Sequence, residues 1–115
     1  MTLICGRVNF FSGPHLVFKY WLRGKFMRII IVGCGKVGSS IASELNLEGH
    51  EISVVDINHG AVDKLANSLD VLGIEGNGAT YDVLVEAGAE YADLLIAATA
   101  RDEINLYSCL MAKAA

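Results

Sequence analysis

Residues 29–38, with the sequence IIIVGCGKVG, contain the pattern that decides the fold. Four β-branched apolar residues predict a buried strand, and they run directly into a GxGxxG pattern formed by Gly33, Gly35 and Gly38. The first glycine of such a pattern permits a tight turn, the second lets the backbone approach a pyrophosphate, and the third allows close packing of helix on strand. Free amides at the start of the following helix attract phosphate. The pattern predicts a strand, a phosphate-binding loop and a helix, a combination that many dehydrogenases share.

An acidic residue at the end of the next predicted strand strengthens this interpretation. Asp56 lies about 20 residues beyond the glycines, where a carboxylate can accept hydrogen bonds from both ribose hydroxyls of a dinucleotide. The alternative is an ordinary polar residue at a strand end. A 2′-phosphate would meet this negative charge, and the residues that follow, Ile57 to His59, include no arginine. The sequence favours NAD(H) and disfavours NADP.

The loop residues between and beside the glycines have two interpretations each. Lys36 contacts a phosphate or is an ordinary solvated lysine, and Cys34 is a redox-sensitive thiol near the helix terminus or a small filler. The candidate phosphate-binding residues are Gly33, Cys34, Gly35, Lys36, Val37 and Gly38.

Strand and helix patterns alternate along the rest of the chain. Apolar, β-branched runs predict four strands, at residues 29–32, 52–55, 71–74 and 94–99. Helical patterns predict four helices, at residues 37–47, 60–68, 81–87 and from 102 to the end. We expect Val37 on the buried face of the first helix, and Asn58 and Thr80 as caps of the second and third.

The order of these elements is typical of a Rossmann-like, doubly wound α/β fold. The strands are apolar on both faces, as in a parallel sheet covered by helices on each side. Right-handed crossovers then give the strand order 3-2-1-4. Two further strands are expected to be missing, so we predict a C-terminally truncated sheet whose fourth strand is an unpaired apolar edge.

Residues 1–26 differ in composition from the rest. They hold six of the nine aromatic residues, and the first 28 positions carry five of the nine basic residues and no acid. Lys19, Arg23 and Lys25 interrupt the apolar stretch, which argues against a signal peptide. We expect an extraneous or unstructured segment, translated upstream of a true start at Met27, with a basic-aromatic surface anchor as the alternative. The predicted domain is residues 27–115.

Length and charge exclude several classes of protein. A chain of 115 residues has room for one domain, and no apolar run is long enough to span a membrane. Its three cysteines and three histidines show no metal-ligand spacing. All 13 acidic residues follow residue 28, which argues against nucleic-acid binding by the domain.

Two more loops follow predicted strands at the edge where open α/β sheets bind ligands. The first includes Asn77, Gly78 and Ala79, which border an adenine or form a plain turn. In the second, Thr99 or Asp102 could simply cap the last helix. Arg101 is the only cation of that loop.

Four stretches together resemble a known family, the N-terminal RCK (TrkA-N) domain of Trk-type potassium-uptake regulatory subunits. They are MRIIIVGCGKVGSSIASEL, ISVVDIN, GNGATYDVLVEAGAEYADLLIAAT and DEIN, and the resemblance runs from Met27 to Ala115. It implies that Gly33, Gly35 and Gly38 cradle phosphates and that Asp56 holds the adenosine ribose. It also implies an adenine site at residues 77–79 and contacts to the distal end of the nucleotide from Thr99, Arg101 and Asn105.

The same resemblance implies a regulatory role without catalysis. It predicts a cytoplasmic subunit at the inner face of the cell membrane that senses NAD(H), ATP or ADP. Its expected partners are a potassium channel or transporter and further copies of itself, arranged in a ring when the subunit is full length. The alternative is the N-terminal fragment of an NAD-dependent dehydrogenase, because the fold alone does not separate the two.

Overall fold

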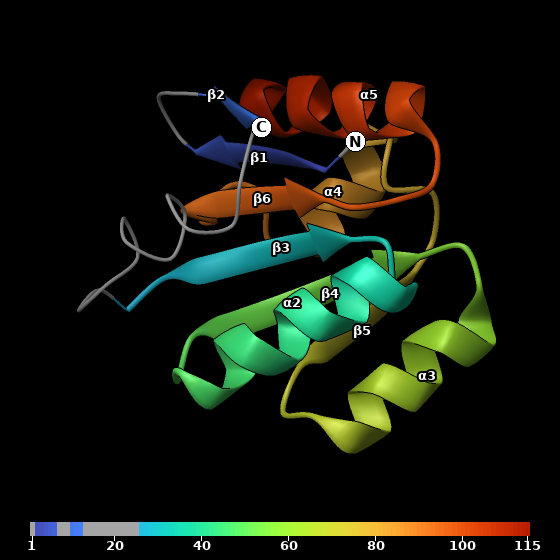
Figure 1. The fold of residues 1–115 in the computed structure, drawn as a ribbon. Coiled ribbons are helices and arrows are strands. Elements are labelled where there is room, and N and C mark those ends of the chain that lie inside the picture. The colour runs from blue at the N-terminus through green and yellow to red at the C-terminus, as the bar shows by residue number, and fades with distance from the viewer. Residues whose placement is uncertain (1, 7–9, 13–25) are drawn as a thin grey trace.

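A computed structural model describes residues 2–6, 10–12 and 26–115, which form one three-layer α/β/α unit (Figure 1). The six strands are β1 (Leu3–Gly6), β2 (Phe10–Ser12), β3 (Arg28–Val32), β4 (Glu51–Asp56), β5 (Leu72–Glu75) and β6 (Leu94–Ala97). The four helices are α2 (Lys36–Leu47), α3 (His59–Ser68), α4 (Tyr81–Glu86) and α5 (Asp102–Ala114). One sheet contains all six strands in the order β2-β1-β6-β3-β4-β5.

The four strands predicted from the sequence form the parallel part of this sheet. β3 lies between β4 and β6, and β5 pairs with β4, so the order β5-β4-β3-β6 confirms the predicted 3-2-1-4 arrangement. Val32 is in register with both Val55 and Ala97, and Asp56 is in register with Glu75. The carboxyl ends of these strands are level, so the loops that follow them meet at one edge.

Alternate residues of each central strand face different helices. Ile29 and Ile31 pack in one apolar cluster with residues of α2 and α3. Ile30 and Val32 pack in a second cluster that includes Leu84 of α4 and residues of α5. Both faces of the strand are buried, which explains why its sequence is continuously apolar.

The structure differs from the sequence-based expectation at the N-terminal segment. Leu3–Gly6 form β1, which is buried and pairs antiparallel with β6, and Phe10–Ser12 form β2, which pairs with β1. These residues are therefore not unstructured, whereas the extraneous origin of residues 1–26 stays a prediction. The expected unpaired edge on β6 is wrong, because β1 pairs with it. A run as short as Leu3–Cys5 gives little periodicity, and its pairing partner lies at the other end of the sequence. Residues 1, 7–9 and 13–25 lie outside the described residues, and the domain boundary at residue 27 stays a prediction.

Two details of the helices also differ from prediction. Val37 is exposed, because α2 begins at Lys36 and its buried positions are Gly38, Ile41, Ala42 and Leu45. Thr80 is the N-cap residue of α4, as predicted, but its side chain makes no capping hydrogen bond, since its hydroxyl donates to the Asn77 carbonyl at 2.7 Å. Asn58 does cap α3: its side-chain oxygen accepts from the Ala61 amide at 3.1 Å.

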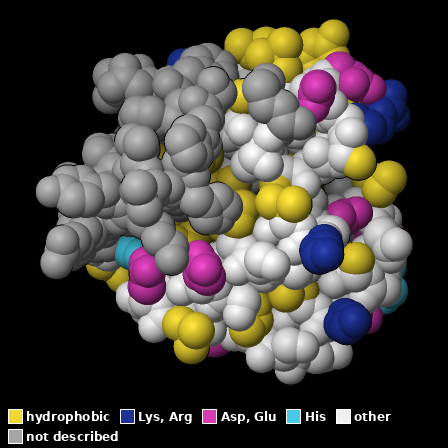
Figure 2. Space-filling view, in the orientation of Figure 1, with side chains coloured by type: hydrophobic (Ala, Val, Ile, Leu, Met, Phe, Trp, Pro, Cys, Tyr) yellow, Lys and Arg dark blue, Asp and Glu magenta, His cyan; other side chains and the backbone are white. Residues whose placement is uncertain are grey.

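A row of apolar side chains remains exposed on α5. Figure 2 shows hydrophobic side chains gathered over this helix, and four large ones are more than a third exposed: Leu106, Tyr107, Leu110 and Met111. Among the described residues, no helix is both long and apolar enough to cross a bilayer.

The packing of α2 on β3 depends on the absence of two side chains. Gly33 has a φ of +108°, and its amide donates to the Val55 carbonyl at 2.7 Å, which turns the chain sharply after β3. A Cβ at Gly38 would lie 1.7 Å from the Gly33 carbonyl oxygen. A Cβ at Gly35 would have no heavy atom within 4 Å. The third glycine is required by packing, whereas the second is not.

The variants Gly38→Ala and Gly35→Ala should therefore differ sharply in stability. Alanine favours helix by about 1 kcal/mol over glycine. At position 38 the backbone clash outweighs this gain, and we expect the free energy of unfolding to fall by about 1–3 kcal/mol or more. Gly35 is the N-cap of α2, where alanine is less favourable than glycine, so Gly35→Ala should lower it by at most about 1 kcal/mol. Urea denaturation followed by circular dichroism measures both; equal stabilities of the two variants would contradict the packing described for α2.

The burial of β1 gives a second prediction. Ile4 is 6% exposed and belongs to the core cluster that includes Met27 and Ile29. Ile4→Ala should destabilise the protein by about 2 to 5 kcal/mol, as for other buried isoleucines. Val37→Ala, at an exposed position, is the matched control and should have little effect. An unchanged melting temperature in Ile4→Ala would mean that β1 contributes nothing to the core.

Candidate functional site

The candidate site lies where the loops after β3, β4, β5 and β6 converge at the carboxyl edge of the sheet. The glycine loop after β3 contacts the loop after β6, since a Cβ at Gly33 would lie 3.0 Å from the carbonyl of Ala98. The loop after β5 contacts the end of β3, since a Cβ at Gly78 would lie 2.3 Å from a methyl group of Val32. The structure thus brings the predicted loops together at one edge, as the parallel topology requires.

Asp56 connects the glycine loop to the loop after β4. Its Oδ2 accepts a hydrogen bond from the Cys34 amide at 2.7 Å, and its Oδ1 accepts one from the Asn58 amide at 2.9 Å. Nothing in the sequence indicated these two contacts. Each carboxylate oxygen has a second lone pair, so Asp56 can still accept from hydroxyl groups of a ligand.

The N-terminus of α2 faces this edge without protein partners. Gly35 is the N-cap and provides no side chain, and the first turn contains no acidic residue. Within the part of the chain that the structure describes, the amides of Lys36, Val37 and Gly38 have no hydrogen-bond acceptor. Unpaired amides at the positive end of a helix dipole attract anions. The open space above Gly35 leaves room for one to approach.

The environment of Cys34 favours its interpretation as a packing residue. The side chain is buried beside the core, and burial, with a smaller contribution from the negative charge of Asp56, raises the pKa of its thiol to about 11. A thiol with so high a pKa is almost entirely protonated near neutral pH and is a poor nucleophile. Its backbone, which binds Asp56, is the part of the residue that shapes the loop.

Residues 77–79 form a tight turn held by its own hydrogen bonds. The side-chain oxygen of Asn77 accepts from the Ala79 amide at 2.8 Å, and the Asn77 carbonyl accepts from the Thr80 amide at 3.0 Å. The Gly76 amide donates to the Asp56 carbonyl at 2.9 Å, which ties this turn to the end of β4. The turn is therefore closed by its own hydrogen bonds and joined to the end of β4 at Asp56.

The loop after β6 is organised around a buried asparagine. The side chain of Asn105 is fully buried; its oxygen accepts from the amide and the hydroxyl of Thr99 at 3.0 and 2.6 Å, and its nitrogen donates to the Thr99 carbonyl at 3.2 Å. Arg101 is exposed, and its Nε lies 2.7 Å from Oε1 of Glu103. Of the three residues predicted to face the nucleotide, Asn105 is beneath the loop and the other two are on it.

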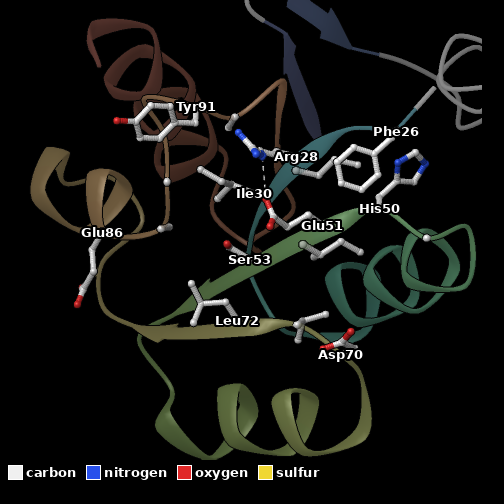
Figure 3. A pocket seen from close by; sticks show the side chains of 17 residues that line it. Phe26, Arg28, Ile30, His50, Glu51, Ser53, Asp70, Leu72, Glu86 and Tyr91 are labelled. Atoms are coloured by element: carbon white, nitrogen blue, oxygen red, sulfur yellow. Dashed lines mark ion pairs between the residues drawn. The ribbon is translucent and has the colours of Figure 1, made fainter.

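A cavity lies at the opposite, amino edge of the sheet. It has a volume of about 870 Å³, and Figure 3 shows it between the starts of β3, β4 and β5 and the chain after α4. An ion pair between Arg28 and Glu51, 3.0 Å long, lies beside it, and Tyr91 and Leu72 line other parts. None of the predicted site residues lines this cavity. We place the candidate site at the carboxyl edge, because the free helix amides and the glycine loop are there.

The described residues contain no group of three or more His, Cys, Asp or Glu side chains close enough to hold a metal ion.

Comparison with known proteins finds relatives that share one name and match about three quarters of this chain. The Trk system potassium uptake protein TrkA of Azorhizobium caulinodans is 42% identical over 83 residues, which are 72% of this chain and 18% of that protein. The TrkA protein of Vibrio alginolyticus is 41% identical over 86 residues, 75% of this chain and 19% of that protein. A TrkA homolog of Pyrococcus abyssi is 34% identical over 87 residues, 76% of this chain and 38% of that protein. The chain thus spans well under half the length of these relatives.

One solved structure is more distantly similar. The Bordetella bronchiseptica enzyme WbmG, in complex with NAD, is 30% identical, covers 60% of this chain and 23% of its own, and has a TM-score of 0.45. Because this similarity covers only part of both chains and its TM-score is low, we do not base the family assignment on it. The model of the TrkA-N domain, in contrast, matches residues 29–115, from the first parallel strand to the last residue. The chain belongs to the TrkA-N domain family.

Proposed function

We propose that this domain binds NAD(H), with ATP and ADP as alternative ligands, and that it serves as the nucleotide-sensing part of a regulatory subunit for potassium uptake. The observation that carries the proposal is the N-terminus of α2, where three amides have no hydrogen-bond acceptor among the described residues and lie beside a glycine that leaves open space. A pyrophosphate satisfies such amides and gains from the helix dipole. Gly33, Gly35 and Gly38 then surround the phosphates with backbone.

The other proposed contacts to the nucleotide come from the neighbouring loops, because the parallel strands end at the same level and their loops lie side by side. Asp56 accepts hydrogen bonds from the adenosine ribose on the lone pairs that the Cys34 and Asn58 amides leave free. The turn at residues 77–79 borders the adenine. Thr99 and Arg101 face the distal half of the nucleotide, and Asn105 positions their loop from below rather than contacting the ligand. NADP binds poorly, because its 2′-phosphate would approach the Asp56 carboxylate.

The regulatory role rests on the names of the relatives. Several are Trk system potassium uptake proteins, which disfavours the alternative of a dehydrogenase fragment. In the proposed mechanism, nucleotides differ in affinity for two arrangements of the subunit, so their exchange changes the populations of those arrangements. This change in arrangement is transmitted through a ring of such domains to a potassium channel or transporter subunit at the inner face of the membrane. No covalent chemistry is required.

Removal of the Asp56 charge should weaken binding and change the cofactor preference. In Asp56→Asn the ribose and the Cys34 amide both lose a charged acceptor, so we expect at least a tenfold loss of NAD affinity, since a charged hydrogen bond contributes about 1.5–3 kcal/mol. The ratio of NADP to NAD affinity should rise, because repulsion of the 2′-phosphate disappears. Thermal shift with NAD, NADH, NADP, ATP and ADP measures these effects.

The control is Asp70→Asn, an exposed carboxylate at the opposite edge, which should leave all five shifts unchanged. A ligand at 100 times its dissociation constant stabilises a protein by about 2.7 kcal/mol, so real binding is easily detected. If the melting temperature of the folded protein does not change with any of the five nucleotides, the proposed function is wrong.

Gly35→Ala tests the phosphate contact separately from the fold. The substitution leaves the fold intact by the geometry above, but its methyl group occupies the space through which a pyrophosphate reaches the helix amides. We expect the melting temperature without ligand to fall by at most a few degrees, as for the loss of a helix cap, and the affinity for NAD and ATP to fall about tenfold or more. Isothermal titration calorimetry measures both affinities; wild-type affinity in the variant would place the phosphates elsewhere.

A further inference from the structure

One face of the sheet is covered by a helix over only part of its length. Val55 and Ile74, next to the carboxyl ends of β4 and β5, pack in the apolar cluster that includes Leu84 of α4. α4 has six residues, whereas α3 and α2 on the other face have ten and twelve. The helix ends at Glu86, which borders the cavity at the amino edge. The cavity is therefore the part of this face that α4 does not reach.

The floor of the cavity is a row of three side chains from neighbouring strands. Ile30 is in register with Ser53, and Ser53 is in register with Leu72, so the three side chains point to the same face. Figure 3 shows them one below another at the centre of the cavity. Leu72 is 54% exposed, and among the described residues the Ser53 hydroxyl has no hydrogen-bond partner. The floor thus offers apolar surface with one hydroxyl group in its middle.

The charges around this floor are mainly negative. Three carboxylates and one guanidinium line the cavity, from Glu51, Asp70, Glu86 and Arg28. The guanidinium of Arg28 pairs with Glu51 at 3.0 Å. Asp70 and Glu86 are exposed and have neither a hydrogen bond nor an ion pair within the described part of the chain. Figure 3 shows them on opposite sides of Leu72, so the apolar floor lies between two unpaired carboxylates.

We propose that this cavity binds an aliphatic polyamine, a molecule in which ammonium groups are joined by methylene chains. The methylene chains lie over Ile30 and Leu72, and the ammonium groups donate to the carboxylates of Asp70 and Glu86 and to the Ser53 hydroxyl. The volume of about 870 Å³ lies within the usual range of small-molecule sites. A compact inorganic cation would leave the apolar floor in contact with water, and a neutral apolar ligand would gain nothing from the carboxylates. This site is separate from the carboxyl edge and does not depend on nucleotide binding.

Spermidine and hexaamminecobalt(III) are matched probes of this site. Both are trications at neutral pH, but only spermidine has an aliphatic chain. Isothermal titration calorimetry of the full chain with each probe, at an ionic strength of about 0.15 M to screen distant charges, measures affinity and stoichiometry. We expect one spermidine per chain, bound about tenfold or more tightly than hexaamminecobalt(III), as burial of a few methylene groups predicts.

Four variants separate the charged and the apolar parts of the site. Asp70→Asn and Glu86→Gln should each lower the affinity for spermidine about fivefold, as for the loss of one charge contact in water. Asp82→Asn removes an exposed carboxylate from the other end of α4, outside the cavity lining, and should leave this affinity unchanged. Leu72→Ser should weaken the binding of spermidine and not that of hexaamminecobalt(III), because it removes apolar surface and no charge.

All four positions are exposed, so the variants should keep the wild-type fold and nearly the wild-type melting temperature, which circular dichroism measures. Effects on spermidine affinity that are confined to Asp70→Asn, Glu86→Gln and Leu72→Ser would support the site. Equal affinities for the two trications, or equal losses in Asp82→Asn and Glu86→Gln, would mean a general attraction of cations to an acidic protein and would overturn the inference. Absence of spermidine binding to the folded wild-type protein would overturn it as well.

Discussion

The contact between Gly38 and the Gly33 carbonyl is the constraint on which the rest of the structure depends. A side chain at position 38 would occupy the place of that oxygen, so the first turn of α2 lies directly on the loop after β3. This close approach fixes where α2 begins and where its unpaired amides lie relative to the sheet. The helix then covers one face of β3 and β4 with Ile41, Ala42 and Leu45. The missing Cβ at Gly38 and the positive φ of Gly33 thus together set both the packing and the position of the candidate site.

Asp56 extends this arrangement from one loop to the neighbouring ones. Its side chain accepts from the backbone of the glycine loop and from the residue that caps α3, and its own carbonyl accepts from the Gly76 amide. Three of the loops at the carboxyl edge are therefore joined through one residue. Because a charged acceptor makes stronger hydrogen bonds than a neutral one, the carboxylate contributes to the order of the loops even without a ligand.

The parts of the fold that could be predicted from the sequence are those whose signals are local. The run at residues 29–32, the glycine spacing and the cap at Asn58 each act within a few residues, and together they gave the parallel strand order. β1 was missed because its burial depends on pairing with β6, which no local pattern records. For the site, the position of Asp56 was predictable, but its bond to the Cys34 amide was not, since it depends on how two loops face each other. Asn105 was assigned to the ligand, while its burial places it under the loop.

The pairing of β1 with β6 also constrains the order in which the molecule can assemble. Leu3 is in register with Ala97, so β1 pairs with a strand that is synthesised after β3, β4 and β5. Closing a loop of that length costs entropy, which only the completed edge of β6 can offset. During synthesis β1 has no native partner until residues 94–97 have emerged. β3, β4 and β5 are already synthesised by then, so the parallel part of the sheet can begin to form before β1 has its partner.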